Sequence, residues 1–372
     1  MNPLTVKKHW DIFCKIVDNF GDIGVCWRLS KQLNHEHGLV VRLFVDDLNA
    51  AKKIIPTLNL ALNQQNIDEI DVLSWRAETD FNDAADVVIE AFACELPAVY
   101  LSAMAQKKSK WINLEYLSAE TWVADFHAKP SPQANGLTRY FYFPGFRENT
   151  GGLIREKNQQ FAHRSSKQHL FCKSQDLTNH NHLKVSLFCY PHAPIESLLV
   201  AMAESNRPTD CYVPTSGILQ KFGNFFGLST LNVGVNYTFK NLNLHVLPFL
   251  TQADYDALLA ACDVNFVRGE DSWVRAIWAA KPFIWQPYFQ EENTHIKKLN
   301  AFLDMFYADF EAKRTVYQAH DDWVEAELSP ATWQDYLNQL PYIAEYTLQQ
   351  SQKLTKQVDL ATKLVGFCNN IA

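Results

Sequence analysis

The sequence lacks several features that would place it in other protein classes. No run of about 18 apolar residues occurs, so we expect no transmembrane helix, and the N-terminal segment, interrupted by Asp11 and Lys15, has no signal-peptide pattern. Only 13 of 372 residues are glycine, which excludes collagen-like and linker-like chains. Positive charge is not in excess, because 34 Lys and Arg face 41 Asp and Glu for a net charge of −7. We therefore expect binding neither to nucleic acid nor to a membrane.

Paired cysteines are also missing. The eight cysteines are scattered without a C-x-x-C pair, and most lie in apolar segments, where free cysteine behaves as a small core residue. This usage predicts a reducing, cytoplasmic location. His163, His169, His180 and His182 lie together in a polar stretch, but no Cys or carboxylate completes a ligand set at metal spacing. We therefore expect no metal site there.

What is present is a globular composition with 47% hydrophobic residues and a length typical of two domains. Short apolar runs alternate with helix-like stretches, which predicts βαβ units. The predicted strands are Asp11–Val17, Val40–Val45, Val87–Phe92, Trp111–Leu114, Tyr140–Phe143, Lys184–Tyr190, Leu242–Leu247, Asp263–Val267 and Pro282–Gln286. The predicted helices are Ile23–Asn34, Glu95–Lys107, Pro194–Glu204, Thr251–Ala261, Asp271–Ala280 and a long terminal one, Pro341–Phe367.

This order predicts an α/β protein with two Rossmann-like domains facing a cleft. We expect one domain at residues 1–160 and the other at 183–349, joined by the polar stretch Glu156–His182. A C-terminal helix at approximately 350–372 is expected to pack back towards the first domain.

The first strand leads into a loop with two carboxylates, Asp18 and Asp22, in the segment V-D-N-F-G-D-I-G-V. Open α/β sheets bind ligands at this end of a strand, but the dinucleotide spacing G-x-G-x-x-G is absent. Two carboxylates would repel a phosphate, so a cationic or hydroxylic partner fits better. The alternative is that one of the two aspartates, such as Asp22, caps the following helix and the other is solvated.

A second informative segment, R-G-E-D-S, begins at Arg268, where another predicted strand ends and a helix starts. Helix N-termini bind phosphate through free N–H groups and the helix dipole, and Arg268 and Ser272 add a charge and a hydroxyl. Glu270 would repel phosphate, so it faces sugar hydroxyls or a cationic acceptor in this interpretation. The alternative is that Asp271 or Ser272 is a simple N-cap.

Aromatic residues follow the strands of the second half. Phe188 and Tyr190 come at the end of one, and Phe249 and Tyr255 follow another. Each alone is more often a core residue, but nucleobases stack on such rings.

These segments together resemble the bacterial elongation factor P arginine rhamnosyltransferases, a family of inverting glycosyltransferases with the two-domain GT-B architecture. The combination of D-N-x-G-D-I-G and R-G-E-D-S is specific, and the similar segments span nearly the whole chain. They are Trp10–Cys14, Val17–Val25, Glu90–Phe92, Asn113–Leu117, Pro144–Phe146 and Arg268–Ser272.

The resemblance implies transfer of L-rhamnose from dTDP-β-L-rhamnose to an arginine of elongation factor P. By the same resemblance Asp18 and Asp22 serve the acceptor guanidinium, with Asp22 favoured as general base, and Glu270 is the third catalytic residue. The implied donor-binding residues are Tyr190, Arg268, Ser272 and Tyr288 for the diphosphate and sugar, with Glu270 also facing the sugar; Phe188, Phe249 and Tyr255 for the thymine; and Gln252 and Asp271 beside them.

The chemistry constrains this interpretation. An arginine has a pKa of roughly 12.5–13.8 and an aspartate one near 3.9, so a carboxylate accepts the proton only as the new C–N bond forms. Two carboxylates allow one to hold the planar guanidinium while the other takes the proton. Arg268 and the helix start stabilise the leaving diphosphate, so we expect neither metal nor cofactor.

Three other functions are weighed against this one. A Rossmann oxidoreductase is disfavoured by the missing dinucleotide motif. A catalytically silent protein that binds a nucleotide sugar or a translation factor is disfavoured by the carboxylates. A glycosyltransferase acting on a small molecule or glycan is the nearest alternative.

Overall fold

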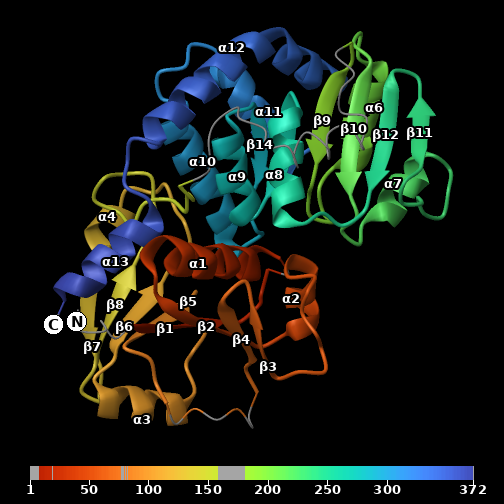
Figure 1. Ribbon diagram of the computed structural model, residues 1–372. Coiled ribbons are helices and arrows are strands. Elements are labelled where there is room, and N and C mark those ends of the chain that lie inside the picture. Colours follow the sequence, from red (N-terminus) through yellow and green to blue (C-terminus); the bar gives the residue numbers. More distant parts are fainter. Residues whose placement is uncertain are drawn as a thin grey trace. The chain divides into compact units, whose positions relative to one another are not determined.

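The computed structural model describes residues 8–371 apart from 19, 77, 78, 80, 82 and 158–180 (Figure 1). The chain divides into two compact units: unit 1 comprises Met1–Gln159 and Lys356–Ala372, and unit 2 comprises Gln160–Thr355. The predicted connection Glu156–His182 lies mostly outside the described residues. Cys172 and three histidines of this stretch, His163, His169 and His180, also lie outside them.

Unit 1 is built on an eight-stranded sheet with the order β3-β4-β2-β1-β5-β6-β8-β7. The strands from β4 to β8 in this order pair in parallel, and β3 and β7 add antiparallel edges. A central strand such as β5 is buried on both faces, which explains the apolar run of Val87, Val88 and Ile89. The buried Glu90 that follows accepts hydrogen bonds from the Trp111 indole and the Glu95 N–H. The strands are β1 (His9–Cys14), β2 (Val40–Val45), β3 (Gln64–Ile67), β4 (Ile70–Ser74), β5 (Val87–Ala91), β6 (Lys110–Leu114), β7 (Lys129–Pro132) and β8 (Thr138–Tyr142).

Helices cover both faces of this sheet (Figure 1). α1 and α13 lie on one face, and α3 lies on the other, where its Tyr100 packs on Phe13 and Phe44. The helices of unit 1 are α1 (Gly21–His37), α2 (Leu48–Ile54), α3 (Ala98–Lys107), α4 (Val123–Phe126) and α13 (Leu360–Asn370).

The C-terminal segment corrects one prediction. Instead of a single helix over Pro341–Phe367, the chain forms α12 (Pro330–Leu354) in unit 2 and α13 in unit 1. The new helix begins because the Asp359 side chain caps it, accepting a hydrogen bond from the Thr362 N–H. Lys110 of β6 donates its Nζ to the Cys368 and Ile371 carbonyls, at 2.8 and 2.6 Å. The expected return of the C-terminus to the first domain is confirmed.

Unit 2 holds a six-stranded sheet of order β11-β12-β10-β9-β13-β14, parallel except at β11. Its strands are β9 (Leu183–Leu187), β10 (Thr209–Pro214), β11 (Asn236–Phe239), β12 (Leu242–Leu247), β13 (Val264–Arg268) and β14 (Phe283–Gln286). Its other helical elements are α6 (Ile195–Glu204), α7 (Leu219–Phe225), α8 (Gln252–Ala261), α9 (Asp271–Ala279), η1 (Glu291–Asn293), α10 (Thr294–Phe306) and α11 (Lys313–Glu325).

Most predicted elements are confirmed within a few residues, with informative exceptions. β9 ends at Leu187, so Phe188 and Tyr190 lie in the loop that follows and not in the strand. Thr251 is the N-cap of α8, since its side chain accepts from the Asp254 N–H. The structure adds strands that were not predicted from the sequence: the four-residue edge strands β3, β7 and β11, and the interior strands β4 and β10.

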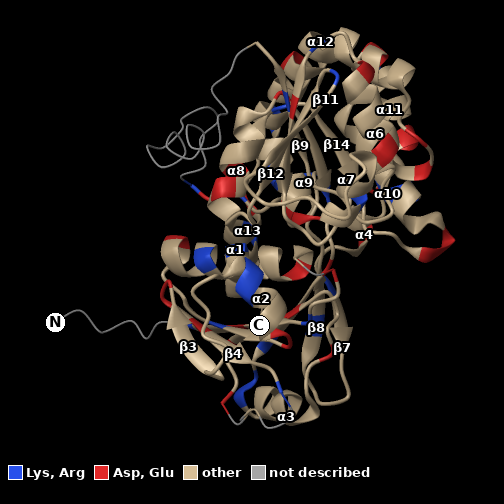
Figure 2. Cartoon of the chain, turned by 90° about the vertical axis from the view of Figure 1, so that its right-hand side faces the viewer, with Lys and Arg blue, Asp and Glu red and all other residues tan. Residues whose placement is uncertain are grey.

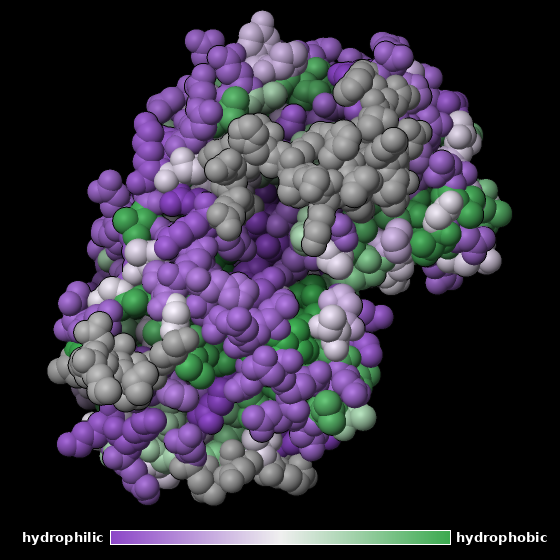
Figure 3. All heavy atoms as spheres, viewed as in Figure 1, coloured by the Kyte–Doolittle hydropathy of each residue, from purple (hydrophilic) through white to green (hydrophobic). Residues whose placement is uncertain are grey.

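The surface views agree with the mixed charge of the sequence. Lys and Arg are scattered among Asp and Glu over both units (Figure 2). On the face drawn in Figure 3, apolar side chains gather over the region of α7 and β11. The exposed apolar residues of this region are Leu228, Val233, Val235 and Phe239.

Candidate active site

Asp18 lies in the connection from β1 to α1, at the carboxyl end of a central strand of unit 1, and Asp22 lies in the first turn of α1. Asp22 is only 1% exposed. Its Oδ2 accepts hydrogen bonds from the Val17 and Asp18 N–H groups, at 2.7 and 2.9 Å, and its Oδ1 accepts from the Tyr116 hydroxyl at 3.3 Å. The Asp22 carboxylate therefore fixes the loop to the start of the helix.

Neither aspartate occupies the N-cap position of α1. The N-cap of α1 is Phe20, which makes no side-chain cap hydrogen bond. Asp22 is the second residue of the helix and bonds backward to the loop. Asp18 lies against the helix start, because a Cβ on Gly21 would come within 2.7 Å of its Oδ2.

The environment of Asp22 favours proton uptake. Burial raises the pKa of its carboxyl above the ordinary value, and the negative charge of Asp18 raises it further, while hydrogen bonds from Asp18, Val17 and Tyr116 oppose the rise. A carboxylate with a raised pKa is a better base than a solvated one. Beside half-buried Asp18 it suits a cationic group.

In unit 2 the predicted cluster forms around Arg268, the last residue of β13. Its buried guanidinium lies 4.3 Å from the ring centre of Phe188 and 4.6 Å from that of Tyr190. Its Nη1 donates to the Cys189 carbonyl at 2.9 Å. The two aromatic residues that follow β9 thus hold a positive charge in place.

The start of α9 supports the same cluster. Glu270 is the N-cap and makes no side-chain cap hydrogen bond, so the alternative of Asp271 or Ser272 as a simple N-cap is wrong. Ser272 Oγ accepts from the Arg268 N–H at 3.0 Å and donates to the Arg268 carbonyl. Asp271 Oδ2 accepts from Gln252 Nε2 at 3.3 Å, which joins the starts of α8 and α9.

The other predicted residues of unit 2 extend this cluster. The Tyr255 ring lies edge-on to Phe188 at 5.6 Å, and the Tyr288 ring lies edge-on to Tyr190 at 5.8 Å. Phe249 is half-buried in the connection from β12 to α8. The rings and Arg268 together offer apolar faces and a positive charge at one sheet edge.

Comparison with known proteins identifies the family of this chain. The model of the family described as elongation factor P rhamnosyltransferase EarP matches residues 10–369. The chain belongs to the EarP family. A protein-arginine rhamnosyltransferase of Pseudomonas aeruginosa is 42% identical over 371 residues, 96% of this chain and 98% of that protein. One of Neisseria meningitidis is 39% identical over 300 residues, 79% of this chain and 77% of that protein.

Solved structures agree. A structure described as the basis for EarP-mediated arginine glycosylation of translation elongation factor EF-P matches with a TM-score of 0.69 and 30% identity, covering 98% of this chain and 100% of that one. A spinosyn rhamnosyltransferase with thymidine diphosphate has a TM-score of 0.54 at 9% identity, over 98% and 100% of the chains. The predicted GT-B type α/β fold and the predicted enzyme class, a glycosyltransferase, are confirmed.

The sequence interpretation of this EarP-family enzyme missed His192 and Lys221. The His192 ring stacks on Tyr190 at 5.6 Å. Burial lowers the pKa of His192, and the positive charges of His295, Lys221 and Arg268 lower it further. Cationic groups therefore gather beside the Tyr190 loop. Lys221 comes from α7, far along the chain, and only the position of His192 just after a strand was a signal in the sequence.

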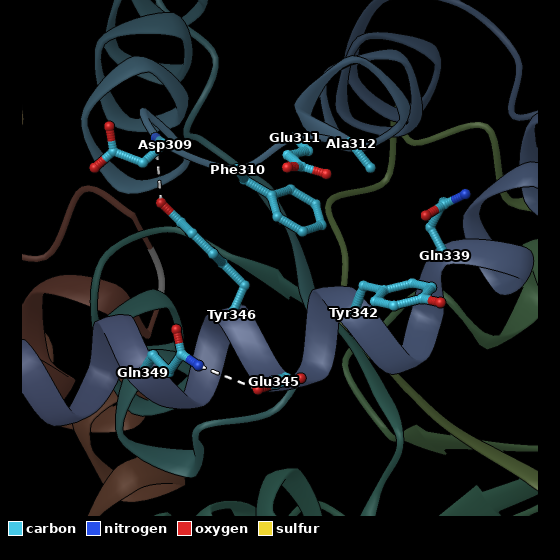
Figure 4. Close-up of a pocket in the computed structure, with 9 residues that line it drawn as sticks. All are labelled: Asp309, Phe310, Glu311, Ala312, Gln339, Tyr342, Glu345, Tyr346 and Gln349. Atoms are coloured by element: carbon cyan, nitrogen blue, oxygen red, sulfur yellow. Dashed lines mark hydrogen bonds between the residues drawn. The ribbon is translucent and has the colours of Figure 1, made fainter.

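The family's predicted site residues do not line the surface pocket shown in Figure 4. This pocket of about 630 Å³ lies between α12 and the segment that joins α10 to α11. Tyr342 and Tyr346 form part of its wall, and Glu345 accepts a hydrogen bond from Gln349 at 3.3 Å. The presence of a pocket of this volume therefore does not mark the candidate active site.

Two features are absent from the described residues. Within residues 8–371, gaps excepted, no group of three or more His, Cys, Asp or Glu side chains is arranged to hold a metal ion. Among the helices that the structure describes, none is long and apolar enough to cross a membrane.

Proposed function

We propose that this EarP-family enzyme transfers L-rhamnose from dTDP-β-L-rhamnose to an arginine of elongation factor P, with inversion at the sugar carbon. The curated relatives are named protein-arginine rhamnosyltransferases, and the related solved structure concerns arginine glycosylation of this factor. The observation that carries the proposal is the buried Asp22 carboxylate next to Asp18, a pair suited to a guanidinium.

In the proposed reaction the two units supply different parts of the chemistry. Asp18 holds the guanidinium, and Asp22 accepts its proton while the nitrogen bonds to the sugar carbon. The bond from that carbon to the diphosphate breaks, and the leaving dTDP takes its electron pair. Arg268 and the start of α9 stabilise the diphosphate charge, Glu270 faces the sugar, and aromatic residues enclose the thymine.

Three features support the donor assignment. Arg268 is buried on two rings, Lys221 adds a second positive charge near His192, and no dinucleotide motif competes. None of the seven described cysteines forms a disulfide, which supports a reducing compartment. We therefore keep the cytoplasm as the proposed location.

The deciding experiment measures the intact mass of elongation factor P after incubation with the enzyme and dTDP-rhamnose. The expected result is a gain of one deoxyhexose, which peptide mapping places on an arginine. Asp22→Asn enzyme is the matched control. A donor that is consumed only with a small-molecule or glycan acceptor, while elongation factor P keeps its mass, would favour that alternative and overturn the proposal.

A further inference from the structure

Two of the segments that resemble the family contain no residue with a role in the proposed reaction. Glu90–Phe92 ends β5, and Asn113–Leu117 ends β6. These strands follow β1 in the sheet order β1-β5-β6. Their carboxyl ends therefore lie at the same sheet edge as Asp18 and Asp22.

An aromatic pair stands beside the Asp22 carboxylate at this edge. The rings of Tyr116 and Phe92 stack with centres 4.4 Å apart and planes inclined by 11°. The Tyr116 hydroxyl donates to Asp22 Oδ1 at 3.3 Å, from 94 residues away along the chain. Both rings are half-buried, and the hydroxyl takes the carboxylate oxygen that the loop N–H groups leave open.

The backbone that carries Phe92 is strained, and buried polar groups hold it. Phe92 and Ala93 have φ of 58° and 53°, a conformation that side chains other than glycine rarely adopt. The Ala93 N–H donates to Asn113 Oδ1 at 3.1 Å, and the Glu95 N–H donates to Glu90 Oε1 at 3.1 Å. Asn113 and Glu90 are both almost fully buried. Strain maintained in this way is typical of functional sites.

We propose that Tyr116 is a positioning residue that fixes the Asp22 carboxylate for proton transfer, and that Phe92 fixes the Tyr116 ring by stacking on it. This inference rests on the proposed function. Without the hydroxyl, Asp22 Oδ1 loses its side-chain donor, and the carboxylate gains freedom to turn away from the acceptor nitrogen. Small misplacements of a reacting group cost rate more than binding.

The hydroxyl also has an electrostatic effect. Its hydrogen bond stabilises the ionised carboxylate and lowers the pKa of Asp22 against the larger raising effect of burial. The other titratable groups facing Asp22 are Asp18 on the same loop and the Cys14 thiol at the end of β1. Cys14 stays neutral because contact with Cys26 and burial raise its pKa well above the ordinary value. Removing the hydroxyl therefore raises the pKa of Asp22.

The test uses Tyr116→Phe, which keeps the ring and its stack. We expect kcat for rhamnose transfer to fall roughly 10-fold with little change in KM for either substrate. The acid limb of the kcat profile should move to higher pH. Phe92→Leu, which keeps the hydroxyl but loses the stack, should show a smaller loss of kcat. Tyr140→Phe on β8, which removes a hydroxyl elsewhere in unit 1, should match the wild type.

A measurement on the enzyme alone separates this inference from the proposed function. The ¹³C shift of the Asp22 carboxyl, followed by NMR titration, should report a higher pKa in Tyr116→Phe than in the wild type. An unchanged titration together with unchanged kcat overturns the role of Tyr116. If the wild type leaves elongation factor P unmodified, the proposed function fails, whereas the titration still tests the contact between Tyr116 and Asp22.

Discussion

The strand-to-helix loops of the two units are tied in the same way but carry opposite charges. In each, the second residue of the helix bonds back to the N–H group four positions earlier, Asp22 to Asp18 in unit 1 and Ser272 to Arg268 in unit 2. Unit 1 thereby holds a buried anion, and unit 2 places a buried guanidinium on two rings. The same local fold thus presents opposite chemistry, because function depends on the loop residues.

The largest effect is expected from removing the negative charge of Asp22 in unit 1. Asp22→Asn retains an oxygen for the Val17 and Asp18 N–H groups but loses the charge and the proton acceptor. We predict a fall in kcat on the order of 10²–10⁴-fold, with dTDP affinity and thermal stability nearly unchanged at neutral pH. Asp18→Asn should lower turnover less, through a misplaced guanidinium.

Enzyme assays, calorimetry with dTDP and thermal melting check this prediction. Asp46→Asn is the matched control, since the exposed Asp46 also accepts a backbone hydrogen bond, from the Ile16 N–H at 2.9 Å. Full turnover in Asp22→Asn would refute its role as base. Unfolding of Asp22→Asn would show that the Asp22 carboxylate serves to hold the loop and not as a base.

The second-largest effect is expected at the loops of unit 2, which carry Arg268 and the aromatic rings. If unit 2 binds the donor, Phe249→Ala should weaken dTDP binding by roughly 5- to 100-fold, the scale of a lost base-stacking contact. Phe239→Ala, which removes an exposed ring of β11 in the same unit, is the control. Calorimetry measures both variants, and an unchanged affinity in Phe249→Ala removes that residue from the thymine pocket.

A smaller effect should appear in pH dependence. Because the ionised form of Asp22 is active, the rate should fall as the pH drops through its raised pKa, with a midpoint above 3.8. The folded state binds this proton more tightly than the unfolded chain. Asp22 therefore contributes stability below about pH 4 that is lost as the pH rises through the raised pKa. Rate profiles and melting curves of wild type and Asp22→Asn test both statements, and identical melting profiles would contradict the second.

The smallest expected effect is that of chelation. If Arg268 and the helix start neutralise the leaving diphosphate, turnover should be the same in EDTA as in Mg²⁺. The assay compares initial rates in both buffers after dialysis of the enzyme. Loss of activity in EDTA that Mg²⁺ or Mn²⁺ restores would show that unit 2 needs a metal ion to balance the donor charge.

The structural features that could be predicted from the sequence are those that depend on residues close along the chain. Apolar runs of the central strands, the turn residues and the cap at Thr251 act locally, so the βα order and the loops with Asp18 and Arg268 were readable. Five strands were not predicted. β3, β7 and β11 are four-residue edge strands that form only against a neighbour, and the interior strands β4 and β10 include the polar residues Asp71 and Asp210 in their short runs. The Asp359 cap of α13 is a local signal, but the packing of that helix on unit 1, which includes the bonds from Lys110, depends on the tertiary structure.

Site residues follow the same division. Their types and approximate places came from the sequence by itself, since a carboxylate or guanidinium in a loop after a strand is visible there. Which groups meet was decided only by the tertiary structure: Tyr116 reaches Asp22 across 94 residues, and Arg268 Nη1 reaches the Cys189 carbonyl across 79. Side-chain contacts over such separations depend on strand order and packing, and so do the burial and neighbouring charges that set the pKa of Asp22.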